Sequence, residues 1–246
     1  MEPIYRLQFE ISDIHLDCFG RVKPSVLLFF NQEAAGQHCH LLKADWDTLN
    51  ERKLFWAITR HRVQISRLPG PGETITVETW PMPTTKVAYP RSTIGYDSNG
   101  NEIFRSISLW VLMNTETRAM VLPRKSGVDV PGTLRGNELA VPGSLLPKVL
   151  HNHCCRTVGY TELDRNGHMN NTRYLDWIDD LLPSAFHAQH PVREITICYH
   201  NEAREQQQLD LTWELTEGPC LQVDAHRRQT PESTGETRIF SAQLQF

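Results

Sequence analysis

The sequence lacks the features that would place the protein in a membrane or outside the cell. No apolar run approaches the roughly 18 residues that a helix needs to cross a bilayer, and the greasy stretch near the start covers only residues 26–30. Residues 1–6 carry no basic stretch leading into an apolar one, which argues against a secretory signal. The net charge of −4 offers no basic footprint for nucleic acid. We therefore expect a cytoplasmic protein with no membrane span and no nucleic-acid partner.

Motifs for several common chemistries are also missing. The sequence has no C-x-x-C and no H-E-x-x-H, and its six cysteines are not spaced as a disulfide framework. We interpret the histidines and cysteines at 38–40 and 151–155 as surface histidines and core thiols. No G-x-S-x-G, G-x-x-x-x-G-K-[ST] or G-x-G-x-x-G is present, which argues against an α/β-hydrolase and against a nucleotide site. We expect neither a metal nor a cofactor.

The sequence does contain two copies of one pattern. Asp17 lies over Asp164 at an offset of 147 residues. Gly20 lies over Gly167 at the same offset, and in each copy this loop precedes apolar residues at helical spacing. Further on, the alternating stretches 74–79 and 209–213 match at an offset of 134, so the first copy has about 13 extra residues, around 43–52.

Each copy predicts a loop, a long helix and then an antiparallel sheet. A helix with one apolar stripe needs a sheet to cover it, and two such sheets can join side by side. The intervening stretch 124–147 holds three of the fifteen prolines and four glycines and reads as a linker. We therefore predict an α+β tandem repeat with domains at 1–123 and 148–246; the pattern leaves the strand order open.

The densest polar cluster is the loop 164–174 of the second copy. A solvated turn with an Asn cap would be its ordinary interpretation. However, the first copy has Phe19 in place of Asn166 and Arg21 in place of His168. Since a simple turn would not need this difference, the second copy is the candidate for chemistry.

This loop also carries a resemblance to a known family. It resembles the signature of acyl-acyl-carrier-protein (acyl-ACP) thioesterases in the pattern Asp164-x-Asn166-x-His168-x-x-Asn171-x-x-Tyr174-x-x-Trp177. The stretch 195–202 is similar to the family's strand ending in Tyr-x-x-Glu, and stretches 54–60, 71–73 and 108–113 fit as well. The resemblance implies two tandem hotdog domains, each a long helix wrapped by an antiparallel sheet, with acyl-chain binding in the first and catalysis in the second. Plant members commonly carry a cysteine after that glutamate, long discussed as a nucleophile. This chain has Ala203 there, which favours a carboxylate-and-water mechanism. The sequence also lacks the leading transit segment of plastid members, so we expect it to resemble a bacterial-type relative.

Hydrolysis of a thioester needs an activated water and a donor for the developing oxyanion. With the resemblance, Glu202 is the candidate base, Asn166 would hold the carbonyl or the water, and His168 would assist the leaving sulfur or Glu202. Asp164 would orient Asn166 or His168. Backbone N–H groups near Gly167 and His168 could form an oxyanion hole.

The apolar slot for the acyl chain is less defined by the sequence. Its candidates are apolar or aromatic residues of the first copy and two residues of the second-copy motif: Val26, Leu27, Phe30, Phe55, Trp56, Ile58, Asn171 and Tyr174. For each residue of the first copy, core packing is an equally good interpretation.

The expected activity is hydrolysis of fatty acyl-ACP to free fatty acid and holo-ACP. The expected partner is an acyl carrier protein bearing a fatty acyl-phosphopantetheine, and the protein would be a monomer or homodimer. Three alternatives stay open: an acyl-CoA thioesterase on the same scaffold, a non-catalytic acyl-binding hotdog, and a dehydratase. Chain-length preference cannot be derived from the sequence.

Overall fold

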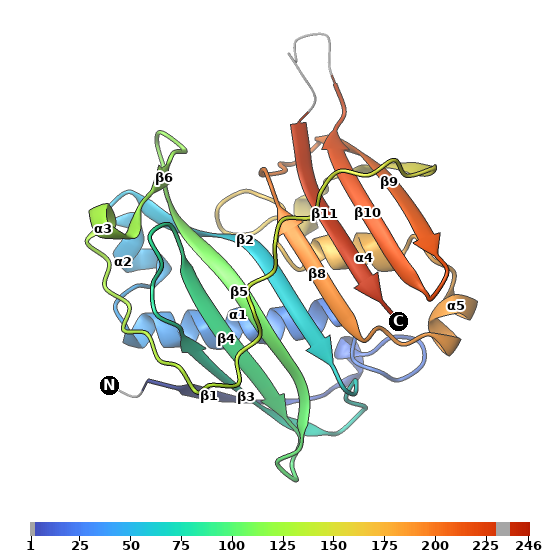
Figure 1. Ribbon diagram of the computed structural model, residues 1–246, viewed down its shortest axis with the longest axis horizontal. Coiled ribbons are helices and arrows are strands. Elements are labelled where there is room, and N and C mark those ends of the chain that lie inside the picture. The colour runs from blue at the N-terminus through green and yellow to red at the C-terminus, as the bar shows by residue number, and fades with distance from the viewer. Residues whose placement is uncertain (1–2, 230–236) are drawn as a thin grey trace. The chain divides into compact units, whose positions relative to one another are not determined.

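The computed structural model describes residues 3–229 and 237–246, and it divides into two compact units, Met1–Pro142 and Gly143–Phe246 (Figure 1). We call them the first and the second unit. Each combines helices with an antiparallel sheet, which confirms the predicted α+β class. The division falls inside the stretch that the sequence predicts as a linker.

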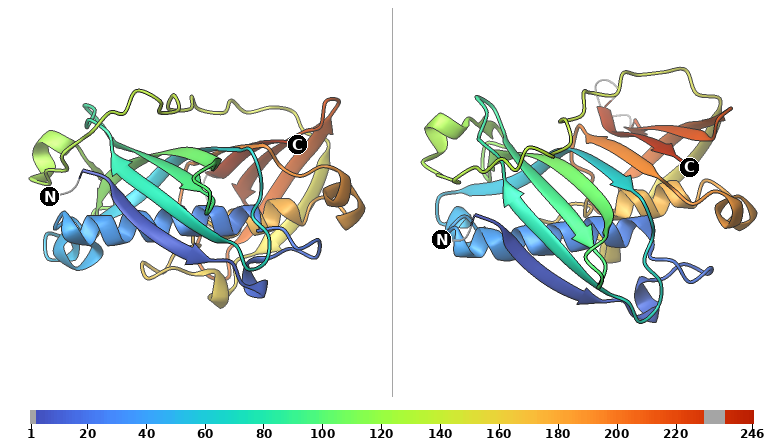
Figure 2. Two further views of the ribbon diagram at one scale, coloured as in Figure 1. Left: turned by 90° about the horizontal axis from the view of Figure 1, so that it is seen from below. Right: turned by 60° about the horizontal axis from the view of Figure 1, so that its bottom comes forward.

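The first unit is a long helix lying against a sheet of order β1-β3-β4-β5-β2 (Figure 2). Helix α1 (Pro24–Leu41) begins with a proline, whose fixed backbone angle suits the first helical position. Its Phe30 ring lies 4.2 Å from the ring of Phe9 in the sheet, so apolar burial holds the helix in place. The strands are β1 (Tyr5–Glu10), β2 (Leu54–Ile65), β3 (Thr74–Pro81), β4 (Tyr89–Tyr96) and β5 (Glu102–Asn114), with β6 (Met120–Val121) paired to β5.

Shorter helical elements complete the first unit. These are η1 (Asp13–His15), α2 (Trp46–Asn50) and α3 (Pro123–Ser126). Helix α2 lies within the predicted insertion at 43–52, and the Asp45 carboxylate caps it by accepting a hydrogen bond from Thr48 N at 2.9 Å. The insertion is therefore a small folded element.

The second unit has the sheet order β8-β11-β10-β9-β7. Its elements are β7 (Asn152–Thr157), η2 (Tyr160–Glu162), α4 (Arg173–Asp179), α5 (Ser184–Gln189), β8 (Glu194–Tyr199), β9 (Gln208–Thr216), β10 (Cys220–Arg227) and β11 (Thr237–Gln245). The single long helix expected here is replaced by α4 and α5. Pro183, which stands where the first copy has Gly36, cannot donate a helical hydrogen bond and clashes with the preceding turn.

Backbone hydrogen bonds confirm the internal repeat. Asp17 N donates to Arg21 O at 2.7 Å, and Asp164 N donates to His168 O at 2.7 Å. After the helices the second offset applies. Val22 N donates to Pro69 O at 2.9 Å, and its counterpart Met169 N donates to Ala203 O at 2.8 Å. Both offsets read from the sequence thus describe real structural equivalences.

The predicted linker packs onto the sheets instead of crossing solvent. Val130 is buried, and Thr133 N donates to Pro81 O at 2.8 Å. In the second unit, Arg238 donates to Leu145 O at 3.0 Å. Only the start of this stretch, residues 124–126, is helical, and hydrogen bonds to each unit hold the rest.

Candidate active site

The loop 164–169 owes its shape to one carboxylate and one glycine. Asp164 Oδ1 accepts hydrogen bonds from Asn166 N at 2.8 Å and from His168 N at 3.2 Å. Gly167 has φ 75°, a left-handed conformation that residues other than glycine rarely adopt. The loop therefore presents Asn166 and His168 from a fixed backbone.

The structure brings the predicted catalytic residues His168 and Glu202 into contact. His168 Nε2 lies 3.1 Å from Glu202 Oε2. Only 10% of the His168 side chain is exposed, against 34% for Glu202, so the carboxylate can meet water while the imidazole is held. The hydrogen bond from Met169 N to Ala203 O fixes the loop beside the end of β8.

Asp164 also engages the backbone groups that were candidates for an oxyanion hole. Gly167 N donates to Asp164 O at 3.0 Å, and His168 N donates to the Asp164 carboxylate. These two donors therefore already have acceptors in this conformation. The Asn166 side chain makes a longer hydrogen bond of 3.4 Å to Asp164 Oδ2. The Asn166 amide is therefore a better candidate than these two backbone N–H groups to donate to a substrate carbonyl.

Two arginines lie near Glu202, and the sequence-based predictions did not include them. Arg227 donates to the carbonyl of Glu202 at 2.7 Å, and its buried Nε has no hydrogen-bond partner within the described residues. An Arg204 nitrogen lies 3.8 Å from Glu202 Oε2. Arg227 comes from β10, far along the chain, and no local motif marks it.

The motif residues Asn171 and Tyr174 lie in the same unit. Tyr174 is buried, and its ring contacts those of Tyr199 and Phe240. Burial raises the pKa of Tyr174 well above its ordinary value, and the nearby carboxylates of Asp164 and Glu202 raise it further. Tyr199 donates to Asn171 O at 3.0 Å. Both motif residues thus take part in the packing and hydrogen bonding of the second unit.

The first copy keeps the loop but not the reactive groups. Arg21, in the place of His168, donates to Asp17 Oδ2 through Nε at 3.0 Å and through a terminal nitrogen at 2.9 Å. Leu68 stands where the second copy has Glu202. In the first copy, the Asp17 carboxylate that anchors the loop is thus held in an ion pair with Arg21.

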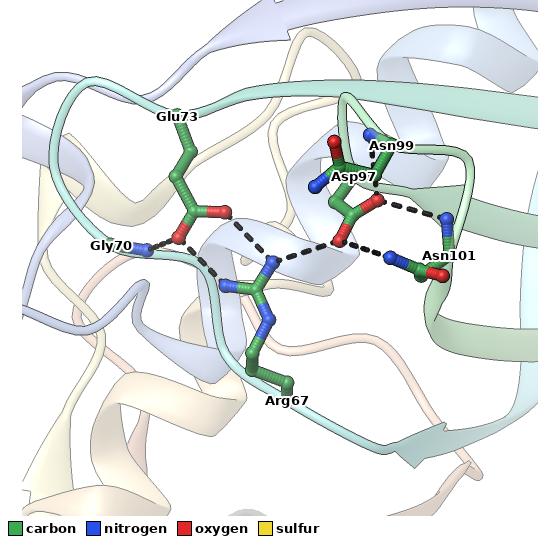
Figure 3. Close-up of polar contacts among 6 residues, drawn as sticks. All are labelled: Arg67, Gly70, Glu73, Asp97, Asn99 and Asn101. Carbon is green, nitrogen blue, oxygen red and sulfur yellow. Dashed lines mark hydrogen bonds and ion pairs between the residues drawn. The ribbon is translucent and has the colours of Figure 1, made fainter.

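In the first unit, a network of charged and polar side chains lies near Leu68 in the sequence and includes Arg67 and Glu73 (Figure 3). Glu73 accepts from Gly70 N at 2.6 Å and from Arg67 at 2.7 Å, and Arg67 also lies 3.6 Å from Asp97. The hydrogen bond from Arg67 is the largest cause that lowers the pKa of Glu73. Asp97 accepts backbone hydrogen bonds from Asn99 and Asn101, both at 2.9 Å. This network ties turns together.

The predicted acyl-slot residues of the first unit fall into two groups. Leu27 and Phe30 are fully buried on α1, Ile58 is buried on β2, and Val26 is partly exposed. Trp56 lies instead in a cluster with residues such as Leu49 and Tyr89, and it donates to Ala44 O at 2.8 Å. Phe55 is buried beneath the guanidinium of Arg118. The assignment of these six residues to an acyl slot stays a prediction.

Two further features of the structure concern metal binding and membrane insertion. Within residues 3–229 and 237–246, no group of three or more His, Cys, Asp or Glu side chains is arranged to hold a metal. No helix in the same ranges has the length and apolar character to span a membrane. All six cysteines are free thiols.

Comparison with known proteins identifies the family of this chain. The family model described as the acyl-ACP thioesterase N-terminal domain matches residues 2–123, and that of the C-terminal domain matches residues 152–240. The chain belongs to the acyl-ACP thioesterase family. The family's C-terminal domain is the one that contains the contact between His168 and Glu202.

Individual acyl-ACP thioesterases are similar over most of the chain. The chloroplastic palmitoyl-acyl carrier protein thioesterase of Gossypium hirsutum is 27% identical over 214 residues, covering 81% of this chain and 52% of that protein. An acyl-ACP thioesterase structure from Bacteroides thetaiotaomicron has a TM-score of 0.88 and 23% identity, covering 99% of this chain and 98% of that one. A 12:0-ACP thioesterase from Umbellularia californica has a TM-score of 0.82 and 21% identity, with coverage of 100% and 97%. These structures confirm the tandem hotdog fold. The chain spans about half the length of the curated relatives it matches.

Proposed function

We propose that this protein hydrolyses the thioester of fatty acyl-ACP, releasing free fatty acid and holo-ACP. The contact between His168 and Glu202 at 3.1 Å carries the proposal, because it pairs a general base with a proton donor in a partly open position. The first copy, with Arg21 and Leu68 at these places, offers no such pair. The first unit takes the acyl chain in this proposal, and the second unit performs the chemistry.

Glu202 accepts a proton as a water oxygen adds to the thioester carbonyl carbon. The tetrahedral intermediate then breaks its carbon–sulfur bond. His168 passes the proton that Glu202 took from water to the departing thiolate. The Asn166 amide donates a hydrogen bond to the developing oxyanion. Asp164 holds the loop that carries Asn166 and His168. No covalent acyl-enzyme forms, in keeping with Ala203 after the glutamate.

Positive charge near the site favours an acidic carrier. Arg204 is more than half exposed, and Arg165 is exposed on the catalytic loop itself. Carrier proteins of this class are acidic, and phosphopantetheine adds a phosphodiester, which arginine binds well. In the first unit, Arg67 is instead committed to Glu73 and Asp97.

Release of free thiol from acyl-ACP tests the proposal. His168→Ala and Glu202→Ala should each reduce turnover by about 10²–10⁴-fold, the usual contribution of a positioned acid or base. The matched control is Arg21→Ala, at the equivalent loop position of the first copy, which should retain turnover. Near-full activity in both second-copy variants, with the fold intact by circular dichroism, would refute the assignment.

The same assay separates the alternatives. Matched acyl-ACP and acyl-CoA substrates of one chain length identify the carrier by their kcat/KM ratio. A non-catalytic binder would release no thiol above background. A dehydratase would change acyl unsaturation without releasing thiol.

A further inference from the structure

The core of the first unit contains a polar pair that packing does not explain. Asn31 on α1 is 5% exposed, and His61 on β2 is 4% exposed. Their contact is long, with 3.5 Å between Asn31 Nδ2 and His61 Nε2. The buried Asn31 Oδ1 has no hydrogen-bond partner within the described residues. An unsatisfied buried acceptor costs stability, so its presence calls for a cause.

The surroundings of the pair belong to the predicted acyl slot. Leu27 precedes Asn31 by four positions on α1 and therefore shares its face. Leu27 and Phe30 are fully buried beside it, and Ile58 is buried three positions before His61 on β2. A fatty chain held in this part of the first unit would pass an amide and an imidazole as well as apolar side chains.

Further polar side chains lie on the sheet beside the Asn31–His61 pair. Across the sheet, His61 is paired in register with Ser108, and Ser108 with Arg91. Arg91 contacts His38 Nδ1 at 3.2 Å and Thr79 Oγ1 at 3.3 Å, and the Ser108 hydroxyl accepts from Trp110 at 2.8 Å. On the Asn31–His61 pair itself, Asn31 Oδ1 is a buried acceptor without a hydrogen-bond partner among the described residues.

We infer that the Asn31–His61 pair recognises a hydroxyl group on the acyl chain, so that hydroxyacyl chains are preferred substrates. The inference rests on the proposed thioesterase function. A hydroxyl both donates and accepts: it would donate to Asn31 Oδ1 and accept from a neighbouring N–H of the pair. Burial lowers the pKa of His61 from 6.5 to about 4, so the imidazole is neutral at pH 7 and adds no charge of its own beside the chain.

The test compares substrates that differ only in one hydroxyl. Acyl-ACPs of one chain length are prepared with the hydroxyl at successive carbons, alongside the unsubstituted chain, and kcat/KM is measured by thiol release. We expect at least one position to be preferred over the unsubstituted chain by roughly tenfold, the size of one good hydrogen bond in a buried site.

The double variant Asn31→Leu with His61→Met assigns that preference to the pair. Replacing both partners by apolar residues of similar size is tolerated in a core, so this variant should fold. It should lose the roughly tenfold hydroxyl preference, so that the ratio of kcat/KM between the hydroxylated and the unsubstituted chain falls to about one. Gln32→Leu, the same kind of change one residue along α1, should keep the preference.

Two results would overturn the inference. One is the absence of a preferred hydroxyl position, as expected if an internal water satisfies Asn31. The other is a preference that survives in the double variant. In either case the unsubstituted acyl-ACP is still hydrolysed, whereas failure of the thioesterase function itself would leave no turnover on any chain.

Discussion

The two copies of the loop share a backbone and differ in chemistry. Asp17 and Asp164 each accept two backbone N–H groups from their own loop, and Gly20 and Gly167 have φ of 72° and 75°. In one copy the fourth residue after the aspartate is an arginine bonded to that aspartate; in the other it is a histidine against Glu202. The loop is thus a scaffold that folds without being reactive.

The copies also differ in where they keep unsatisfied polar groups. In the first unit Asn31 Oδ1 lies under the helix, in the core. In the second unit Arg227 Nε lies beside the candidate catalytic strand end. Natural proteins retain such costly groups where function uses them. In the proposed function, the first unit holds the substrate and the second unit cleaves it.

The largest effect is expected when the second copy is given the first copy's residues. His168→Arg with Glu202→Leu should lower kcat/KM for acyl-ACP by about 10²–10⁴-fold, because the base and its partner are both lost. Measurement is by thiol release. The reverse exchange in that background, Arg21→His with Leu68→Glu, should not restore turnover; recovery there would show that the loops are chemically interchangeable.

The next effect concerns stability against pH. The pKa of His61 is lowered by burial to about 4, so the unfolded chain binds a proton more readily between pH 6.5 and pH 4. Stability is therefore lost as the pH falls through this window, by about 2 kcal/mol between pH 7 and pH 5. Urea unfolding at both pH values measures it, and His61→Met should remove that share of the loss. An identical pH dependence in the variant would contradict the prediction.

A smaller effect separates structure from chemistry at the two aspartates. Asp17→Ala and Asp164→Ala should each cost about 1–2 kcal/mol of unfolding free energy, because each removes an acceptor for two loop N–H groups. Only Asp164→Ala should also reduce turnover. Thermal unfolding and thiol release measure the two quantities, and equal turnover in both variants would show that Asp164 orients nothing.

The smallest effect is expected in the turn that contains Gly72 in the first copy and Gln206 in the second. Gly72 has φ 73°, and its counterpart Gln206 has φ 64°. Because a side chain strains this conformation, Gln206→Gly should stabilise the second unit by about 0.5–1 kcal/mol, and Gly72→Gln should destabilise the first by a similar amount. Denaturant midpoints report both. A destabilised Gln206→Gly variant would mean that the Gln206 side chain contributes more than its backbone costs.

Much of this architecture could be predicted because its causes are local. Strand alternation, the Asp-Gly loops and the two offsets all lie in short stretches of sequence. The break before α5 was also readable, since Pro183 cannot continue a helix, but the parallel with α1 favoured one long helix. The arginine beside Glu202 and the burial of Asn31 were not readable. Arg227 lies on a distant strand, and which face of α1 meets the sheet is decided by packing.

The sequence by itself determined that the chain is duplicated and that only the second duplicate carries an asparagine and a histidine in its loop, because these are properties of neighbouring residues. The tertiary structure decided that His168 meets Glu202 and that Asn31 meets His61. Each pair joins residues about thirty positions apart, and no local preference brings such residues together. Burial of the helices against the sheets, with hydrogen bonds such as that from Met169 N to Ala203 O, sets those distances.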